Sequence, residues 1–123
     1  MKITRYDAGH IRATEDGAVL LGARVDGGAV RFPPPEFLID GQQAEAVPLS
    51  AVGALYTYTT VHPGKAPAYS LAMVDFDHDL RVFGRLIDGD AAPTIGARVR
   101  AVPFQLPNGE ADFAFELIGE THS

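Results

Sequence analysis

Apolar and polar residues alternate along most of the second half of the chain, which is the pattern of half-buried β-strands. The stretch 54–62 shows it most clearly, because aromatic and β-branched residues that suit a pleated surface dominate it. The same reasoning predicts four further strands, at 68–76, 80–87, 97–106 and 112–118. Five short antiparallel strands favour an all-β domain, either a five-stranded Greek-key barrel of the OB type or a split sandwich.

The alternation also assigns side chains to faces. In the strand 54–62, a period of two places Tyr56, Tyr58 and His62 on one face and Leu55 on the other. Gly84 interrupts the alternating strand 80–87, and a glycine inside a strand often marks a bulge or a sharp bend. We therefore expect Gly84 to bend the sheet where the barrel closes.

The first half of the chain is patterned more weakly. Residues 18–25 and 29–32 predict a hairpin, because Asp26-Gly27-Gly28 between them is a strong turn signal. Three prolines follow, and we read residues 36–48 as a loop with a short apolar anchor. The composition changes near Pro48, which divides the chain into an N-terminal segment, 1–48, and a barrel domain, 49–123.

The composition narrows the classes of function. The 123 residues include no cysteine, so thiolate metal sites, disulfides and thiol nucleophiles are excluded. No stretch resembles a signal peptide or a membrane span, which predicts a cytoplasmic protein without a membrane partner. The formal net charge of −6 opposes binding to nucleic acid, since neutralisation of phosphates drives most of that affinity.

The chain also lacks catalytic motifs. It contains no GxSxG elbow and no glycine-rich phosphate loop, so we expect neither catalytic residues nor enzyme activity. The acidic run around Asp77-His78-Asp79 is typical of a hairpin turn whose carboxylates bond the local backbone, which leaves no predicted metal site. The plainer interpretation of His62 is a strand-end residue at the rim of the barrel; as a functional residue it would touch a ligand or partner rather than transfer protons.

Arginines concentrate on two of the predicted strands. Arg81 and Arg85 share one strand face, and Arg98 and Arg100 share another. A guanidinium can hold a phosphate bidentately, as the diphosphate of coenzyme A would require. The plainer alternative is a solvated outer face on which the arginines pair with carboxylates.

Four segments follow one another in a characteristic order, namely 53–62, 66–69, 85–88 and 95–99. Together they resemble a known family of acyl-CoA-associated proteins, whose members pair an N-terminal zinc ribbon with an OB-fold domain. The resemblance covers about residues 53–117. It extends upstream to Phe32-Pro33-Pro34, which stands where family members carry a Phe-Pro-Pro segment between two CxxC knuckles.

The zinc ligands of that family are missing. By spacing, the knuckle positions fall at residues that supply no metal ligand, namely Arg24, Gly27, Leu38 and Gly41. We therefore expect a degenerate, metal-free ribbon-like hairpin with no cofactor of its own. Apolar contacts would replace the metal, made by Val25, Val30, Phe37 and Leu38.

The resemblance implies a non-catalytic accessory subunit of a thiolase-like enzyme or of a MaoC-like hydratase, which act on acyl-CoA. Its partner would bind the exposed proline-rich segment, through Phe32, Pro33, Pro34 and Phe37. An acyl-CoA would contact Arg85, Arg98 and His62. Two alternatives stay open, a free-standing CoA-ester binding module and a single-stranded nucleic-acid binder that stacks bases on Tyr56 and Tyr58.

Overall fold

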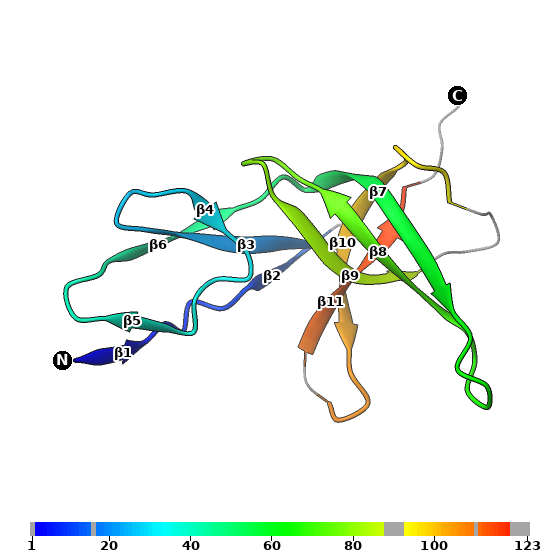
Figure 1. Ribbon diagram of the computed structural model, residues 1–123, viewed down its shortest axis with the longest axis horizontal. Helices are drawn as coiled ribbons and strands as arrows, with labels where there is room; N and C mark the ends of the chain where they lie inside the picture. The colour runs from blue at the N-terminus through cyan, green and yellow to red at the C-terminus, as the bar shows by residue number, and fades with distance from the viewer. Residues whose placement is uncertain (1, 16, 88–92, 110, 119–123) are drawn as a thin grey trace.

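A computed structural model describes residues 2–15, 17–87, 93–109 and 111–118, and every regular element in them is a β-strand. Figure 1 shows a barrel from which the strands of the N-terminal segment extend to one side. The described residues offer no helix with the length and apolarity that crossing a membrane takes. The loop expected at 88–93 lies almost wholly outside the described residues.

The second half of the chain forms a closed five-stranded barrel. Around the barrel the strands run in the order β10-β11-β9-β8-β7, and β10 pairs back onto β7. Only the β11–β9 pair is parallel among these contacts. The bounds are β7 (Val52–Val61), β8 (Tyr69–Asp75), β9 (Arg81–Ile87), β10 (Arg98–Gln105) and β11 (Ala111–Leu117). This closure confirms the predicted OB-type barrel and rules out the split sandwich.

The interior of the barrel is filled by alternating apolar side chains. Every second residue of β8 and β9 faces inward, and the largest fully buried side chains are Phe115, Leu20, Leu55, Val74 and Val99. Ser70 is the buried polar residue of the described core, and its hydroxyl lies 3.0 Å from that of Thr60. This hydrogen bond offsets the cost of burying a hydroxyl group.

A bulge in β7 corrects the predicted face assignment. The pairing with β8 steps from Leu55 directly to Thr57, so Tyr56 is the extra residue. A bulge shifts the alternation by one position, because two residues oppose one on the partner strand. As a result Tyr58 packs against the core while Tyr56 lies exposed on the outer wall.

The structure gives Gly84 a role that the sequence did not predict. Its strand keeps an unbroken register with β8, so Gly84 marks no bulge there. A Cβ atom built at this position would lie 2.9 Å from the ring of Phe115 and 3.1 Å from that of Phe113. Glycine therefore leaves the space that these two rings occupy.

The N-terminal segment contains more strand than its sequence pattern suggests. The hairpin of β3 (Gly17–Val25) and β4 (Val30–Arg31) is present as expected, with Asp26 and Gly27 at positive φ in its turn. The expected loop 36–48 instead contains β5 (Phe37–Ile39) and β6 (Ala44–Pro48), and the weakly patterned start contains β1 (Ile3–Arg5) and β2 (Ile11–Thr14).

These extra strands depend on partners elsewhere in the chain. β6 pairs with β3, and β5 pairs with β1 from the opposite end of the segment. Strands so short carry little pattern of their own, and their partner supplies the hydrogen bonds that hold them.

Hydrogen bonds connect the two turns that stand in the knuckle positions. Asp26 donates its backbone N–H to the carbonyl of Gln43 at 2.8 Å, and its carboxylate accepts the Gln43 N–H at 3.0 Å. The expected apolar staple is therefore wrong in part. Val30 is buried, but the ring of Phe37 is 49% exposed and cannot hold the two turns together.

A chain of aromatic rings joins the N-terminal segment to the barrel. Phe32 meets Phe113 edge-on at 5.8 Å between ring centroids, Phe113 meets Phe115 at 5.6 Å, and Phe115 meets Phe76 at 5.9 Å. The backbones also approach closely, since a Cβ on Gly17 would lie 2.7 Å from the Ala101 carbonyl oxygen. The segment is thus packed onto the barrel core.

Candidate functional site

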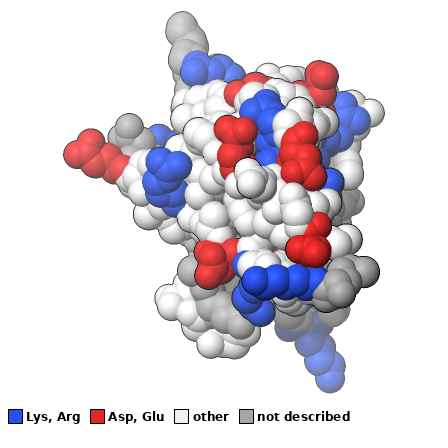
Figure 2. All heavy atoms as spheres, turned by 90° about the vertical axis from the view of Figure 1, so that its left-hand side faces the viewer, with Lys and Arg blue, Asp and Glu red and all other residues white. Residues whose placement is uncertain are grey.

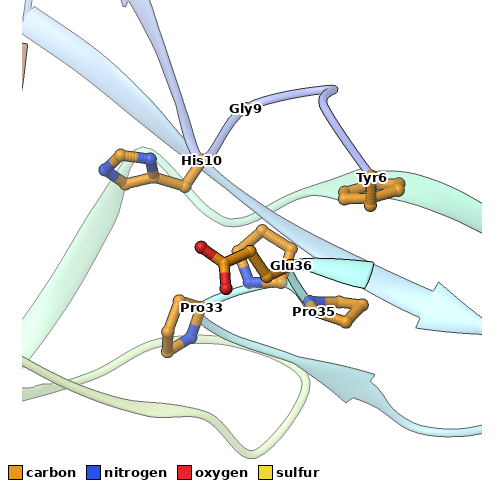
Figure 3. A pocket seen from close by; sticks show the side chains of 7 residues that line it. Tyr6, Gly9, His10, Pro33, Pro35 and Glu36 are labelled. Atoms are coloured by element: carbon orange, nitrogen blue, oxygen red, sulfur yellow. The ribbon is translucent and has the colours of Figure 1, made fainter. Parts of the chain in front are cut away.

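The proline-rich segment borders a groove on the side of the N-terminal segment. Figure 3 shows the groove between the loop that follows β1 and the prolines that follow β4. Its volume is about 340 Å³, and its lining consists of Tyr6, Gly9, His10, Pro33, Pro34, Pro35 and Glu36. Proline rings and a tyrosine give it apolar walls, with an imidazole and a carboxylate as polar groups.

Local contacts hold the groove in shape. Tyr6 donates its backbone N–H to the carbonyl of Glu36 at 2.9 Å, which ties the two walls together. The imidazole Nε2 of His10 lies 3.6 Å from a carboxylate oxygen of Asp112, on the barrel strand β11. The Tyr6 hydroxyl is buried without a hydrogen-bond partner among the described residues.

The four residues predicted to bind a partner fall into two groups. Pro33 and Pro34 line the groove, and Phe37 lies exposed on β5, with the Arg5 guanidinium 5.9 Å from its ring centroid. Phe32 is half-buried, and its ring packs against those of His10 and Phe113, which also contact each other. It joins the two parts of the chain and is not an exposed anchor.

The residues predicted to contact coenzyme A do not converge. Arg98 pairs across the sheet with Ala54 near the start of β7, whereas His62 follows the end of that strand. A strand rises about 3.3 Å per residue, so the two lie roughly 25 Å apart along β7. Arg85 sits on β9, which β11 separates from the strand of Arg98. One CoA headgroup would therefore not meet all three residues.

Carboxylates neutralise two of the arginines on the outer wall. Arg81 bonds Asp75 at 2.6 Å and stacks 3.4 Å over the ring of Tyr56, while Arg100 bonds Glu116 at 3.1 Å. The hydrogen bond to Asp75 raises the pKa of the Arg81 guanidinium above its ordinary value. For Arg81 and Arg100 the structure thus agrees with the plainer alternative, a solvated outer face on which arginines pair with carboxylates.

Arg85 is held differently. Its guanidinium carbon lies 4.7 Å from the ring centroid of Tyr69 and 5.3 Å from that of Phe104. No carboxylate of the described residues forms an ion pair with it. Stacking on aromatic rings orients a guanidinium and leaves its N–H groups available.

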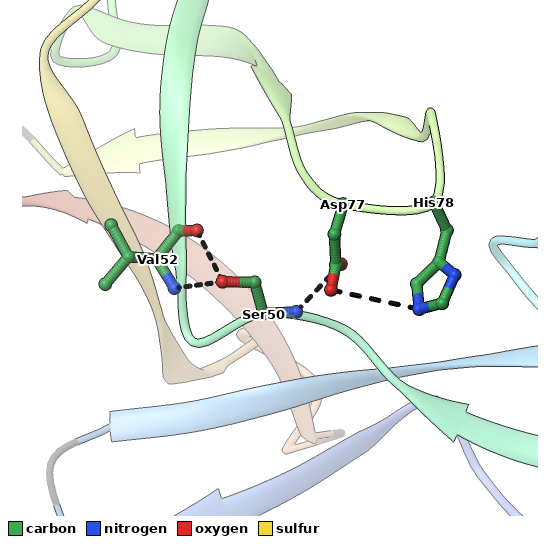
Figure 4. A network of polar contacts seen from close by, with 4 residues as sticks. All are labelled: Ser50, Val52, Asp77 and His78. Carbon is green, nitrogen blue, oxygen red and sulfur yellow. Dashed lines mark hydrogen bonds and ion pairs between the residues drawn. The ribbon is translucent and has the colours of Figure 1, made fainter.

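The acidic turn Asp77-His78-Asp79 forms a long-range hydrogen bond that stabilises the fold. Figure 4 shows Asp77 reaching from the β8–β9 turn to Ser50, on the connection between the two parts of the chain. The Asp77 carboxylate accepts the Ser50 N–H at 3.0 Å, so it bonds backbone 27 positions away rather than its own turn. In the described part of the chain, no three histidine or acidic side chains gather as a metal site would require.

The structure does not support base stacking on Tyr56 and Tyr58, which the alternative of a single-stranded nucleic-acid binder requires. Because Tyr58 packs against the core, Tyr56 and Tyr58 cannot stack successive bases side by side. The face in Figure 2 shows positive and negative side chains interspersed, without an extended basic field. Such a field is what binding a polyanion would need.

Comparison with known proteins identifies the barrel. Residues 46–104 match the family model described as ChsH2, C-terminal OB-fold domain. The barrel is similar to this OB-fold domain of ChsH2. A solved structure described as Ltp2-ChsH2(DUF35) aldolase contains a chain of similar fold, with a TM-score of 0.61 and 21% sequence identity. The likeness covers 80% of this chain and 84% of that one. No curated protein sequence matches.

The likeness to that ChsH2-containing structure reaches beyond the matched barrel. A coverage of 80% is more than the barrel alone can supply, so part of the N-terminal segment shares the fold as well. Sequence reasoning anticipated the OB-type barrel but missed the groove residues Tyr6, His10 and Glu36. Their positions lie in the weakly patterned start and beside the prolines, where only tertiary pairing brings them together.

Proposed function

We propose that this chain is a non-catalytic accessory subunit that binds an enzyme acting on acyl-CoA thioesters, either a thiolase-like enzyme or a hydratase of the MaoC type. The observation that carries the proposal is the match of residues 46–104 to the ChsH2 OB-fold domain. The description of the similar solved structure pairs ChsH2 with the aldolase Ltp2, which supports an enzyme as the partner.

The chemistry of the described residues agrees with a role in binding. Ser70 is buried and bonded to Thr60, Ser50 is bonded to the backbone of Val52, and His62 stands exposed at a strand end. No nucleophile there lies within hydrogen-bond reach of a base, which acyl transfer in this chain would require. The chain would act by positioning or stabilising its partner.

The proline-rich groove is the docking site that this proposal assigns to the enzyme. Prolines are already fixed in φ, so Pro33 and Pro34 lose little conformational entropy when a partner covers them. Phe37 adds an exposed ring on the neighbouring strand β5. Aromatic side chains of this kind often dominate the energy of an interface.

The test is to identify the genes beside the one for this chain and to co-express any thiolase-like or hydratase-like enzyme found there with this chain. We expect a stoichiometric complex on size-exclusion chromatography, and an enzyme that is less stable or less active alone. The isolated chain should not turn over acyl-CoA. Phe37→Ala should weaken the complex about tenfold or less, because the ring is only half exposed to begin with.

Arg31→Ala is the control in the same segment, since Arg31 is exposed on β4 and is not among the residues that line this groove. A neighbouring enzyme that is fully stable and active alone and forms no complex would contradict the proposal. Turnover of acyl-CoA by the purified chain would contradict its non-catalytic part.

A further inference from the structure

The outer wall of β8 and β9 carries an apolar patch that a solvated sheet face does not need. Phe83 is 57% exposed, Met73 36% and Ile87 40%. An antiparallel sheet with one face in water ordinarily alternates apolar residues inside with polar residues outside. Here the inner alternation is regular, yet large apolar side chains also point outward.

The sheet register makes these side chains one surface. Met73 lies directly opposite Phe83, and Leu71 lies opposite Arg85. Cross-strand neighbours on one face have Cβ atoms about 5 Å apart, so their side chains touch. The patch therefore has an apolar centre with Arg85 at its margin.

The combination is that of a protein interface. Phenylalanine, methionine and arginine are enriched at interface cores relative to the remaining surface. The guanidinium of Arg85 lies against the rings of Tyr69 and Phe104, so it is already oriented before a partner arrives. An oriented group loses less entropy on binding than a free one.

The charges on this wall indicate what the partner must supply. β7, β8 and β9 contain a single acidic residue, Asp75, and it is bonded to Arg81. A second copy of the chain stacked on this face would bring no free carboxylate to Arg85. A nucleic acid would find Arg85 as the one uncompensated cation of the three strands, too few for a polyanion.

We propose that the outward face of β8 and β9 is a second contact surface for the enzyme subunit, with Phe83 and Met73 covered by apolar side chains and Arg85 paired with a carboxylate of the enzyme. The inference rests on the proposed function for the identity of the partner. The proposed surface is separate from the proline-rich groove, because β8 and β9 belong to the barrel and the groove belongs to the N-terminal segment.

The experiment is isothermal titration calorimetry of the purified chain into the enzyme that co-expression identifies as its partner. We expect Phe83→Ala and Arg85→Ala each to weaken binding at least about tenfold. Arg85→Lys should recover only part of the loss, because an ammonium cannot reproduce a planar stacked fork. Raising the salt concentration should weaken the wild-type chain more than Arg85→Ala.

Arg31→Ala serves as the charge-matched control and should bind as the wild type does. Phe83 and Arg85 are exposed, so their variants should keep the wild-type circular dichroism and melting temperature. Wild-type affinity for both Phe83→Ala and Arg85→Ala would overturn this inference while the proposed function stood. Failure of the wild-type chain to bind the enzyme would overturn both.

Two further measurements test whether a second copy of the chain or a nucleic acid binds this face instead of the enzyme. Sedimentation of the isolated chain would reveal a dimer, and a dimer that Phe83→Asp dissociates would assign the face to a second copy. Salt-sensitive binding of a fluorescent oligothymidylate, lost in Arg85→Ala, would assign it to nucleic acid. Either result overturns the inference, and a monomer without oligonucleotide affinity supports it.

Discussion

Gly84 shows how one residue fixes the fit of the barrel interior. Its missing side chain makes room for the rings of Phe113 and Phe115, and Phe115 is fully buried. Core packing is as dense as an organic crystal, so rings in this position have little freedom to withdraw. The glycine is needed for space, and no positive φ is found at it.

The residue-scale prediction is that Gly84→Ala destabilises the protein by about 1–3 kcal/mol, the usual cost of overpacking a core. The added methyl group would press on both rings at 2.9 and 3.1 Å. The free energy of unfolding in urea measures the effect. Phe113→Leu in the same chain should recover part of it, and additive effects of the two changes would contradict the explanation.

At the scale of the element, the two turns of the ribbon form one unit without a metal. The Asp26 carboxylate and backbone both bond Gln43, and the β3–β6 ladder continues from Val25 and Ala44. Asp26 also adopts a φ of 51°, a conformation that aspartate and asparagine tolerate better than most residues. The residue type thus suits both the turn and the bond.

The element-scale prediction concerns the substitution of Asp26. Asp26→Ala should destabilise the ribbon by about 1–2 kcal/mol, through the lost hydrogen bond and the unfavourable φ. Asp26→Asn keeps an acceptor oxygen and should be close to neutral. Amide hydrogen exchange at Gln43 measures the difference locally, and equal exchange rates in the two variants would argue against the bond.

At the scale of the whole molecule, aromatic rings couple the two parts of the chain. Phe32 comes directly before the prolines, Phe113 lies on β11, and Phe76 follows the end of β8. The Asp77–Ser50 hydrogen bond fastens the connection between the two parts on another side. Unfolding should therefore be a single transition.

The prediction at this scale compares two phenylalanines five positions apart. Phe32→Ala should cost about 2–3 kcal/mol, less than a fully buried ring because Phe32 is only half-buried. It should also separate the melting of the ribbon from that of the barrel in differential scanning calorimetry. Phe37→Ala, on the exposed face of β5, should change stability by less than about 0.5 kcal/mol. Equal losses in the two variants would show that the aromatic chain does not couple the parts.

The barrel strands could be predicted from the sequence because each carries its own alternation. The run from Leu80 to Ile87 shows its inner and outer faces without reference to any partner. β1 and β5 are three residues long and could not be found this way, since each exists through its pairing with the other. The groove could not be predicted from the sequence either, because the pairing of β1 with β5 is what brings Tyr6 and Pro34 to the same groove.

By itself the sequence determined the all-β class and the absence of cysteine ligands for a zinc ion, because periodicity and residue chemistry are local properties. Only the tertiary structure decided that the five strands close into a barrel and do not form a split sandwich, because closure depends on the pairing of β10 with β7. Only the tertiary structure decided which face each tyrosine of β7 occupies, since one bulge inverts the alternation beyond it. It also decided that Phe32 is a contact between the parts and that Phe83 faces solvent. Burial depends on what the rest of the chain places over a residue, and no local pattern records that.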